Sequence, residues 1–517
     1  MTTLPILRPD QQQLKHGIYG GWNAGLRNML GVLPTGGGKS VVVSDIVDDK
    51  NKLGAQQCVI AHRNELIGQM SLHIAVHGIK HRIIGPPKMV SAIVAKHRRL
   101  FNGYSFISPT AHCSVAGVDT LMARHDDLVA WGKQQDFWTI DEAHHVLAAN
   151  KWGRAVALFP NAFGLGVTAS PQRADGAGLG IHADGVFHDM VVGPPPRELM
   201  NIGAITDFEY VVPASDFQIS DDAITDGGDF SPTKMREASK KSHIVGDVAK
   251  EYIARAFGKR AIVFATDVET SNDIAAQFNA FGIPAASVSA KTPSDVRDDY
   301  VERFRDGRLW VLVNVDLFGE GFDVPACEVV IMARPTASLA VFLQQAGRAL
   351  RTLEGKLYGL IIDHVSNYKR HGFPDKQRYW TLDRREKRGK RPADPEEIPL
   401  TACRNCSRPY EACLPRCPRC GHEPEVMPGG RSSIEQIDGD LILLDRAKLA
   451  ELRAASELAM PADIGQRVSY ATGNPFAGKA AINNQIERIG MQQRLDNAIA
   501  FWAGHQRALN RDRKSVV

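Results

Sequence analysis

No long apolar run occurs in this chain of 517 residues, and none approaches the ~18–20 residues that a membrane span requires. The first residues, Met-Thr-Thr-Leu-Pro, also lack the apolar core of a secretory signal peptide. Charge is nearly balanced, since 62 Lys and Arg oppose 58 Asp and Glu and leave a net charge of +4. A mild excess of this size does not by itself indicate a nucleic-acid partner. We therefore expect a cytoplasmic protein whose chemistry is carried by its motifs.

Cysteine is sparse outside one short segment. Five of the eight cysteines fall within residues 403–420, whereas a disulfide scaffold would spread them over a small secreted chain. Two C-x₂-C pairs separated by ten residues predict tetrahedral Zn²⁺ in a small ribbon over 401–425. The predicted ligands are Cys403, Cys406, Cys417 and Cys420.

Other interpretations of this cysteine segment remain open. The pairs could be reduced surface cysteines or a redox dithiol. Cys413 is either a spare thiol or a ligand in another register, and His422 is a weaker alternative ligand. A segment this short has too little core to fold alone, so metal binding would supply its folding energy.

Two parts of the chain show the pattern of a parallel α/β fold. Short apolar runs bounded by turn residues alternate with longer stretches compatible with helices, as is typical of buried parallel strands. In residues 1–195 the expected strands are Met29–Leu33, Cys58–Ala61, Trp138–Ile140 and Leu165–Thr168. In residues 243–370 they are Ala261–Ala265, Ala286–Ser289, Val311–Val315, Val329–Met332 and Gly359–Ile362.

The remaining segments carry weaker signals. The first domain ends at Gly193-Pro194-Pro195-Pro196, because proline continues neither a helix nor a central strand. Residues 196–242 are expected to form a mixed connector whose polar part, 220–231, is a mobile loop. Residues 371–400 form a basic linker. Residues 431–517 are predicted to be mainly helical, because apolar residues recur there near helical spacing.

A glycine-rich string follows the first expected strand and precedes a helix expected over 40–47. It reads Leu33-Pro34-Thr35-Gly36-Gly37-Gly38-Lys39-Ser40, with Leu33 where the general pattern has glycine. Such glycines let backbone N–H groups converge on phosphate oxygens at a helix N-terminus. Lys39 would then pair with the β- and γ-phosphates, and the Ser40 hydroxyl would bind Mg²⁺. A chance glycine turn is the alternative.

An acidic pair, Asp141 and Glu142, follows the strand expected at Trp138–Ile140. Asp141 is placed to bind Mg²⁺ through water, and Glu142 to orient and deprotonate the attacking water. The alternative is a solvated acidic turn that caps the next helix. The phosphate loop in the same domain favours the catalytic interpretation.

Two arginines of the second domain, Arg348 and Arg351, lie three residues apart and share a helix face with Gln344. Arginines that complete a nucleotide site from another domain stabilise transition-state charge on the γ-phosphate. A surface helix with ion pairs is the alternative. A nucleotide site split between two domains would convert ATP hydrolysis into movement.

Together these strings resemble the motifs of superfamily 2 helicases from about residue 5 to 370, specifically DEAH-box ATPases near the DNA-repair helicases and restriction-enzyme motor subunits. The resemblance implies two tandem RecA-like α/β domains and 3′-to-5′ movement on DNA. Leu7–Gln11 resembles the adenine-reading motif and implies nucleotide contacts for Arg8 and Gln11, although Asp10 stands where the family usually has an aromatic.

The resemblance assigns further roles. Nucleic-acid contacts are implied for Arg63 and Thr120. His144 and the string Thr168-Ala169-Ser170-Pro171 would couple hydrolysis to domain movement, with Ser170 in place of the commoner Thr. Gly321 and Asp323 would approach the nucleotide.

A basic segment suggests an auxiliary contact with nucleic acid. Residues 369–391 hold ten Lys and Arg against three Asp and Glu, and Tyr379 and Trp380 are candidate stacking platforms within 369–420. A solvated charge run beside a structural zinc knob is the alternative. We expect an ATP-dependent DNA helicase or translocase. An RNA helicase, or a motor subunit that docks partners through 431–517, remains open.

Overall fold

The computed structural model describes most of the chain up to residue 384 and a few short stretches beyond it. The described ranges are 6–61, 64–213, 219–225, 227–242, 244–315, 327–384, 400–402, 409–411, 416, 421–423 and 441–444. Residues 1–390 belong, with 437–441, to one compact unit that contains the strands β1 to β13. No helix in these described ranges is both long and apolar enough to cross a bilayer.

The first lobe is built on a parallel sheet with the strand order β3-β4-β2-β5-β6-β1-β7. The strands are β1 Asn28–Val32, β2 Gln57–Ala61, β3 His81–Ile84, β4 Cys113–Gly117, β5 Phe137–Ile140, β6 Phe163–Thr168 and β7 Asp189–Val192. β2, β4 and β5 are buried along their whole length, as expected for parallel strands covered on both faces.

The second lobe repeats this design with the order β10-β11-β9-β12-β13-β8, again with parallel pairings. Its strands are β8 Phe208–Pro213, β9 Ala261–Phe264, β10 Ala285–Val288, β11 Val311–Asn314, β12 Val329–Met332 and β13 Gly359–Asp363. The two tandem RecA-like α/β domains predicted from the sequence are thereby confirmed.

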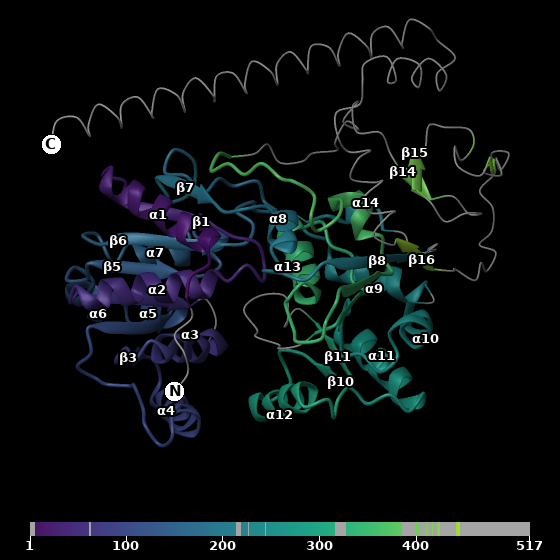
Figure 1. The fold of residues 1–517 in the computed structure, drawn as a ribbon, viewed down its shortest axis with the longest axis horizontal. Helices are drawn as coiled ribbons and strands as arrows, with labels where there is room; N and C mark the ends of the chain where they lie inside the picture. Colours follow the sequence, from purple (N-terminus) through teal and green to yellow (C-terminus); the bar gives the residue numbers. More distant parts are fainter. Residues whose placement is uncertain are drawn as a thin grey trace, which may run out of the picture. The chain divides into compact units, whose positions relative to one another are not determined.

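Helices connect the strands of each sheet, and Figure 1 follows them from purple to green. In the first lobe they are α1 Pro9–Asn23, α2 Lys39–Lys52, α3 Asn64–Val76, α4 Pro87–Leu100, α5 Val118–Ala123, α6 His125–Gly132, η1 Ala143–His145 and α7 Lys151–Val156. The later ones are α8 Pro196–Asn201, η2 Asp221–Ala223, α9 Pro232–Lys240, α10 Ile244–Ala256, α11 Val268–Ala280, α12 Ser294–Arg305, α13 Leu339–Ala349 and α14 Asn367–His371.

The expected connector, residues 196–242, is more ordered than the sequence suggested. It supplies β8, which pairs with β13 of the second sheet. The polar part, expected to be a mobile loop, contains η2 and a turn that is bonded to the second lobe through Asp229. The second sheet therefore begins before residue 243.

After α14 the chain returns to the first lobe as a strap, residues 372–384. Leu382 is buried in the core of the first lobe, and Trp380 packs against the same core. Gly180 N donates to Leu382 O at 3.0 Å. The partly buried Trp380 therefore contributes to packing on the first lobe, whereas Tyr379 is 80% exposed. Their role as stacking platforms stays a prediction.

Several basic side chains of this region are engaged within the protein. Arg370 pairs with Asp221, and Arg384 pairs with Asp184. The Arg378 guanidinium donates to four backbone carbonyls, and burial lowers its pKa to about 10. These basic side chains hold the strap and the connector in place. The number of charges in the sequence does not indicate this structural role.

Candidate active site

The phosphate loop has the backbone shape that its glycines permit. Gly36 and Gly38 have φ values of 84° and 90°, in the left-handed region that favours glycine. Gly37 N donates to Pro34 O at 2.9 Å, and α2 begins directly afterwards at Lys39. The Lys39 ammonium donates to Leu33 O at 3.4 Å, across the loop. The N-terminus of a fourteen-residue helix thus lies beside the lysine, as an anion site requires.

Arg8 and Gln11 hold this loop from the side of α1. Gln11 Nε2 donates to Gly37 O at 3.1 Å, and Arg8 Nη2 donates to the same oxygen at 2.8 Å. Gln11 Oε1 accepts from Arg8 N at 3.0 Å, so both ends of this buried amide are used. The sequence reasoning expected the Gln11 amide to face adenine. In the structure the amide shapes the loop, and a Cβ at Gly38 would lie 2.3 Å from Gln11 Nε2. The contact with adenine stays a prediction.

The acidic motif lies at the carboxyl end of β5. Glu142 is 8% exposed and has a φ of 51°, which is strained for a residue with a side chain. The Asp141 carboxylate accepts from Glu142 N at 2.8 Å and so shapes this turn. Backbone strain of this kind concentrates at functional positions, where the surrounding structure maintains it.

His144 connects the acidic motif to the end of the neighbouring strand, β6. Its Nδ1 lies 3.0 Å from Thr168 Oγ1 and 3.5 Å from Glu142 Oε2. Thr168 Oγ1 in turn donates to Ser170 O and accepts from Ser170 N, each at 3.3 Å. The residues expected to couple hydrolysis to movement thus form one continuous network.

The helix α13 brings the second lobe to these motifs. Gln344 Nε2 donates to Glu142 Oε2 at 3.4 Å. A Cβ at Gly347 would lie 2.4 Å from Thr35 Cγ2, so only glycine allows this approach of the helix to the phosphate loop. A Cβ at Gly36 would lie 3.8 Å from Arg351 Cγ. The structure therefore brings together motifs that lie some 200 residues apart in the sequence.

Two partly buried cations near the site were not predicted from the sequence. Arg173 Nη1 donates to His144 O at 2.8 Å. Lys356 Nζ donates to Ala349 O at 2.6 Å, Arg351 O at 2.9 Å and Cys327 O at 2.8 Å. Arg173 could have been found from its place three residues after Ser170. Lys356 follows the last turn of α13, where cations are favoured, but nothing in the sequence marks it.

Other predicted site residues cannot be placed beside the motifs above. Thr120 lies on α5 after β4 and is partly buried. Among the sequence-predicted residues outside the described ranges are Arg63, Gly321, Asp323, Cys403, Cys406, Cys417 and Cys420. Within the described ranges no three His, Cys, Asp or Glu side chains cluster as a metal site would require.

Both lobes match known protein families. Residues 5–173 match the family described as type III restriction enzyme, res subunit. Residues 245–352 match the family described as helicase conserved C-terminal domain. The two matches contain, respectively, the phosphate loop with the acidic motif and α13 with Gln344 and the arginines.

Individual relatives agree with these family matches. The chain is 32% identical over 450 residues to a 51.5 kDa protein of Lactococcus phage (isolate 7-9), covering 86% of this chain and 89% of that protein. It is 24% identical over 385 residues to a protein of Saccharomyces cerevisiae named as an ATP-dependent helicase, IRC3. That match covers 70% of this chain but only 52% of the yeast protein.

A solved structure shows the same fold. A fragment described as the HsdR subunit of a type I restriction enzyme from Vibrio vulnificus YJ016 superimposes with a TM-score of 0.51 at 18% identity. The superposition covers 72% of this chain and 67% of the fragment. With the family matches, the phage relative and the split nucleotide site, the chain belongs to the superfamily 2 helicases and is an ATP-dependent motor of the helicase type.

Proposed function

We propose that this motor is a DNA helicase or translocase of the DEAH-box group that hydrolyses ATP between its two lobes. The observation that carries the proposal is the contact between Gln344 and Glu142 at 3.4 Å. It joins the helix that bears Arg348 to the carboxylate expected to activate water. The helix ends at Ala349, so Arg351 lies two residues beyond it and not on the same helix as the sequence suggested. A site completed by both lobes makes hydrolysis depend on their relative position.

Each residue of the split site has a chemical task in this proposal. Lys39 and the first N–H groups of α2 bind the phosphates. Glu142 orients the attacking water and takes its proton. Arg348 and Arg351 stabilise the charge that develops on the transferred phosphoryl group, and Arg351 already lies against Gly36 of the phosphate loop.

The donor set suits a hard divalent cation. The Ser40 hydroxyl at the start of α2 and the Asp141 carboxylate at the end of β5 both offer oxygen, which Mg²⁺ prefers. These two residues would hold the ion, which supplies neutralising charge to the phosphates when bound. Asp141 has a second task in the protein, since it also bonds Glu142 N.

Motion follows from the contacts that each lobe makes with the nucleotide. ATP that contacts both lobes binds more tightly to the closed arrangement than to the open one and so favours closure. Hydrolysis removes this difference in affinity. The bonds from Glu142 through His144 to Thr168 and Ser170 are a physical route for this coupling. If each lobe grips the same strand, cycles of closing and opening move the protein along it.

DNA is the favoured nucleic-acid partner because the first lobe matches a restriction-enzyme subunit family. The same description favours a second candidate, in which the chain is the motor subunit of a larger complex. Because this chain spans about half of the yeast relative, the activity of that whole protein is not carried over. Backbone recognition would make binding sensitive to salt and largely independent of sequence.

We also propose a structural zinc site over 401–425. The antiparallel strands β14 Leu400–Ala402 and β15 Pro409–Glu411 pair with each other and flank the first C-x₂-C pair. A short hairpin of this kind is a suitable frame for a zinc knuckle. Metal analysis of the purified chain should give about one Zn²⁺ per molecule, and Cys403→Ser with Cys406→Ser should lose it.

The central experiment is the ATPase rate measured with no nucleic acid, single-stranded DNA, duplex DNA and RNA, with Lys39→Ala as the blank. Strong stimulation by DNA and not by RNA supports the proposal. Stimulation by RNA alone would make the chain an RNA helicase. No stimulation, with ATP still bound, would favour the motor-subunit candidate. Duplexes with 3′ or 5′ tails then test the 3′-to-5′ direction implied by the family resemblance.

A further inference from the structure

A short turn of the expected connector lies between the two lobes. It consists of Thr225 and residues 227–230, here named the Asp229 turn. Thr225 N and Oγ1 both donate to Asp229 O at 2.9 Å, and Gly228 N donates to Thr225 O at 2.9 Å. Phe230 is buried in a small core with Ala223 and Met235, which anchors the base of the turn.

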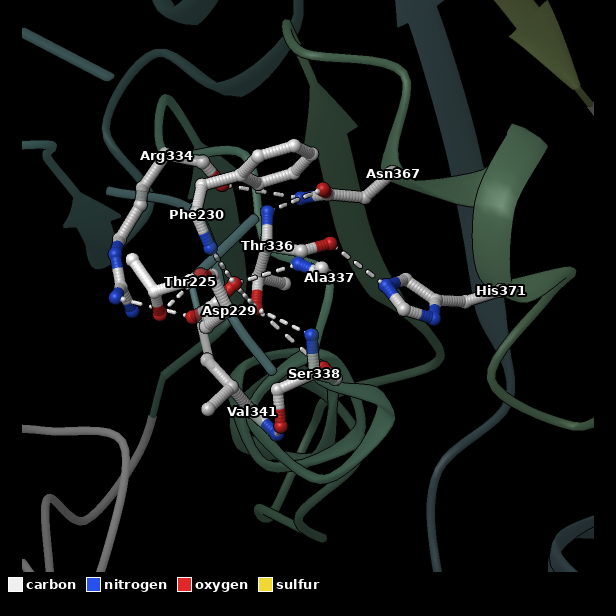
Figure 2. Close-up of polar contacts among 10 residues, drawn as sticks. All are labelled: Thr225, Asp229, Phe230, Arg334, Thr336, Ala337, Ser338, Val341, Asn367 and His371. Carbon is white, nitrogen blue, oxygen red and sulfur yellow. Dashed lines mark hydrogen bonds and ion pairs between the residues drawn. The ribbon is translucent and has the colours of Figure 1, made fainter. Parts of the chain in front are cut away.

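One side of the turn is bonded to the residues that precede α13 (Figure 2). The Asp229 carboxylate accepts from Ala337 N at 2.6 Å and from Thr336 Oγ1 at 3.0 Å. Arg334 Nη2 adds an ion pair at 3.3 Å. A carboxylate that accepts a backbone N–H, a hydroxyl and a guanidinium is held strongly in place.

These bonds continue into the first turn of α13. Thr336 Oγ1 accepts from Ser338 N at 3.1 Å, and Ser338 Oγ accepts from Val341 N at 3.4 Å as the cap of the helix. Behind this corner, Asn367 Oδ1 accepts from Thr336 N at 3.0 Å, as Figure 2 shows. The carboxylate of Asp229 therefore helps to fix where α13 begins.

The other side of the turn faces the first lobe. Gly228 has a φ of +82°, and a Cβ there would lie 2.2 Å from Ala174 O. Ala174 follows Arg173, whose Nη1 donates to His144 O at 2.8 Å. The turn thus contacts the loop that begins with the Thr168–Pro171 string and is tied to the acidic motif.

We propose that the Asp229 turn is a second connection between the lobes that sets the position of α13 relative to the acidic motif. The direct connection is the bond from Gln344 to Glu142. The second passes from His144 through Arg173 and Ala174 to the turn, and then through Thr336 to the start of α13. Asp229 and Gly228 are positioning residues in this arrangement. This inference rests on the proposed ATPase function and names residues that regulate it.

A contact at the N-terminal end of α13 together with one at its middle constrains the direction of the helix better than the middle contact alone. The contacts at Gln344 and Gly347 lie in the middle and the C-terminal half of α13, so without the turn the N-terminal end of the helix could swing and displace Arg348 and Arg351. A displacement of about 1 Å in a positioning element can cost about 100-fold in rate. The turn therefore acts on the chemical step and has no direct part in ATP binding, because neither residue contacts the phosphate loop.

The test compares four full-length variants for kcat and KM for ATP, for affinity toward a fluorescent ATP analogue, and for thermal unfolding. Asp229→Ala removes the carboxylate, and Asp229→Asn keeps its shape but loses its charge. Gly228→Ala places a methyl group against Ala174 O. Its matched control is Gly203→Ala, which has a similar φ of +70° but nothing within 4 Å of the new Cβ.

We expect Asp229→Ala to lower kcat about tenfold or more, with KM and analogue affinity within about threefold of the wild type. Asp229→Asn should have a kcat between those of the wild type and Asp229→Ala. Gly228→Ala should lower kcat while Gly203→Ala does not. A wild-type kcat in both Asp229→Ala and Gly228→Ala, or equal losses in Gly228→Ala and Gly203→Ala, would overturn the inference.

Hydrogen exchange separates this inference from the proposed function. Binding of the ATP analogue should slow exchange of the Ala337 and Val341 amides in the wild type but not in Asp229→Ala. A wild-type chain without ATPase activity would overturn the proposed function. The exchange result would then decide the inference alone, and equal protection in both proteins would refute it.

Discussion

Gln344 Nε2 donates to Glu142 Oε2 at 3.4 Å, although 202 residues separate the two in the sequence. Gln344 is 2% exposed, and in the described part of the chain its Oε1 has no hydrogen-bond partner. A buried amide oxygen beside the proposed general base is placed to accept a hydrogen bond from the attacking water. The second lobe would thereby contribute to orienting water as well as to charge stabilisation.

The first prediction concerns this pair. Gln344→Ala should lower kcat about 10- to 100-fold and leave KM for ATP nearly unchanged, since the contact matters mainly in the transition state. Gln344→Glu should be worse, because a second carboxylate beside Glu142 repels it and raises the pKa of one of the two. Steady-state ATPase kinetics measure both. A Gln344→Ala enzyme with wild-type kcat would show that the contact has no catalytic part.

The second prediction is that Glu142→Gln binds ATP but does not turn it over. The amide preserves the size of the side chain but cannot take a proton from water. ATP should therefore stay bound unhydrolysed and hold the lobes in the closed arrangement. Filter binding of labelled ATP with analysis of the bound nucleotide would show this. Glu302→Gln, on the exposed part of α12, is the matched control and should behave as the wild type.

The third prediction tests the arginine beside the phosphate loop. Arg351→Ala should leave ATP binding largely intact and lower kcat by about 10³-fold or more, on the scale of arginine fingers. Arg303→Ala removes an arginine of α12 and serves as the control. Full activity of the Arg351 variant would rule out its assignment as a finger.

The sequence predicted those strands of the two sheets that are continuous apolar runs. Val329–Met332 has the predicted bounds, and Ala261–Ala265 differs by one residue from β9, because four consecutive buried apolar residues leave few alternatives. β7 and β3 were missed because they are edge strands with partly exposed residues. β4 was missed because its sequence, Cys-Ser-Val-Ala-Gly, consists of small residues.

The residues of the site divide in the same way into those that the sequence predicted and those that it did not. Lys39, Glu142 and Arg351 were predicted because each belongs to a string whose chemistry depends on local spacing. Asp229 and Lys356 act through contacts with residues that come near them only in the folded chain. Asp229 bonds to Thr336, which is 107 residues away. Single-residue contacts of that kind leave no pattern in one sequence.

The fourth prediction concerns a buried pair of histidines in the first lobe. His81 Nε2 and His97 Nε2 both bond to Ser71 Oγ, at 2.7 and 2.9 Å. Burial lowers the pKa of His81 to about 4, an effect that nearby His97 reinforces and the bond to Ile79 O opposes. Between pH 4 and 6.5 the unfolded chain therefore binds more protons, and stability falls as the pH falls through this window.

The expected loss from His81 is about 3 kcal/mol across that window. Urea unfolding of the wild type and His81→Gln at pH 7.5, 5.5 and 4.5 would measure it. The variant should lose less stability on acidification than the wild type, with replacement of the partly exposed His125 by Gln as the control. Equal pH dependence of wild type and His81→Gln would show that His81 is not buried as a neutral side chain.

The last prediction concerns Lys356, which closes the C-terminal end of α13. Its ammonium donates to Ala349 O, Arg351 O and Cys327 O, and burial lowers its pKa. One of these acceptors belongs to Ala349, the last residue of α13, and another belongs to Arg351, the proposed arginine finger. Lys356 therefore connects the backbone of Arg351 to the loop that precedes β12.

Lys356→Met keeps the length of the side chain but leaves three carbonyls without this donor. We expect a loss of about 2–4 kcal/mol in unfolding free energy, together with a fall in kcat caused by displacement of Arg351. Lys52→Met removes a surface ion pair with Asp48 and should cost much less stability than Lys356→Met. Urea unfolding and ATPase kinetics on both variants separate the two effects. If Lys356→Met loses stability but keeps wild-type kcat at a temperature where it is folded, the arginine is positioned by α13 alone.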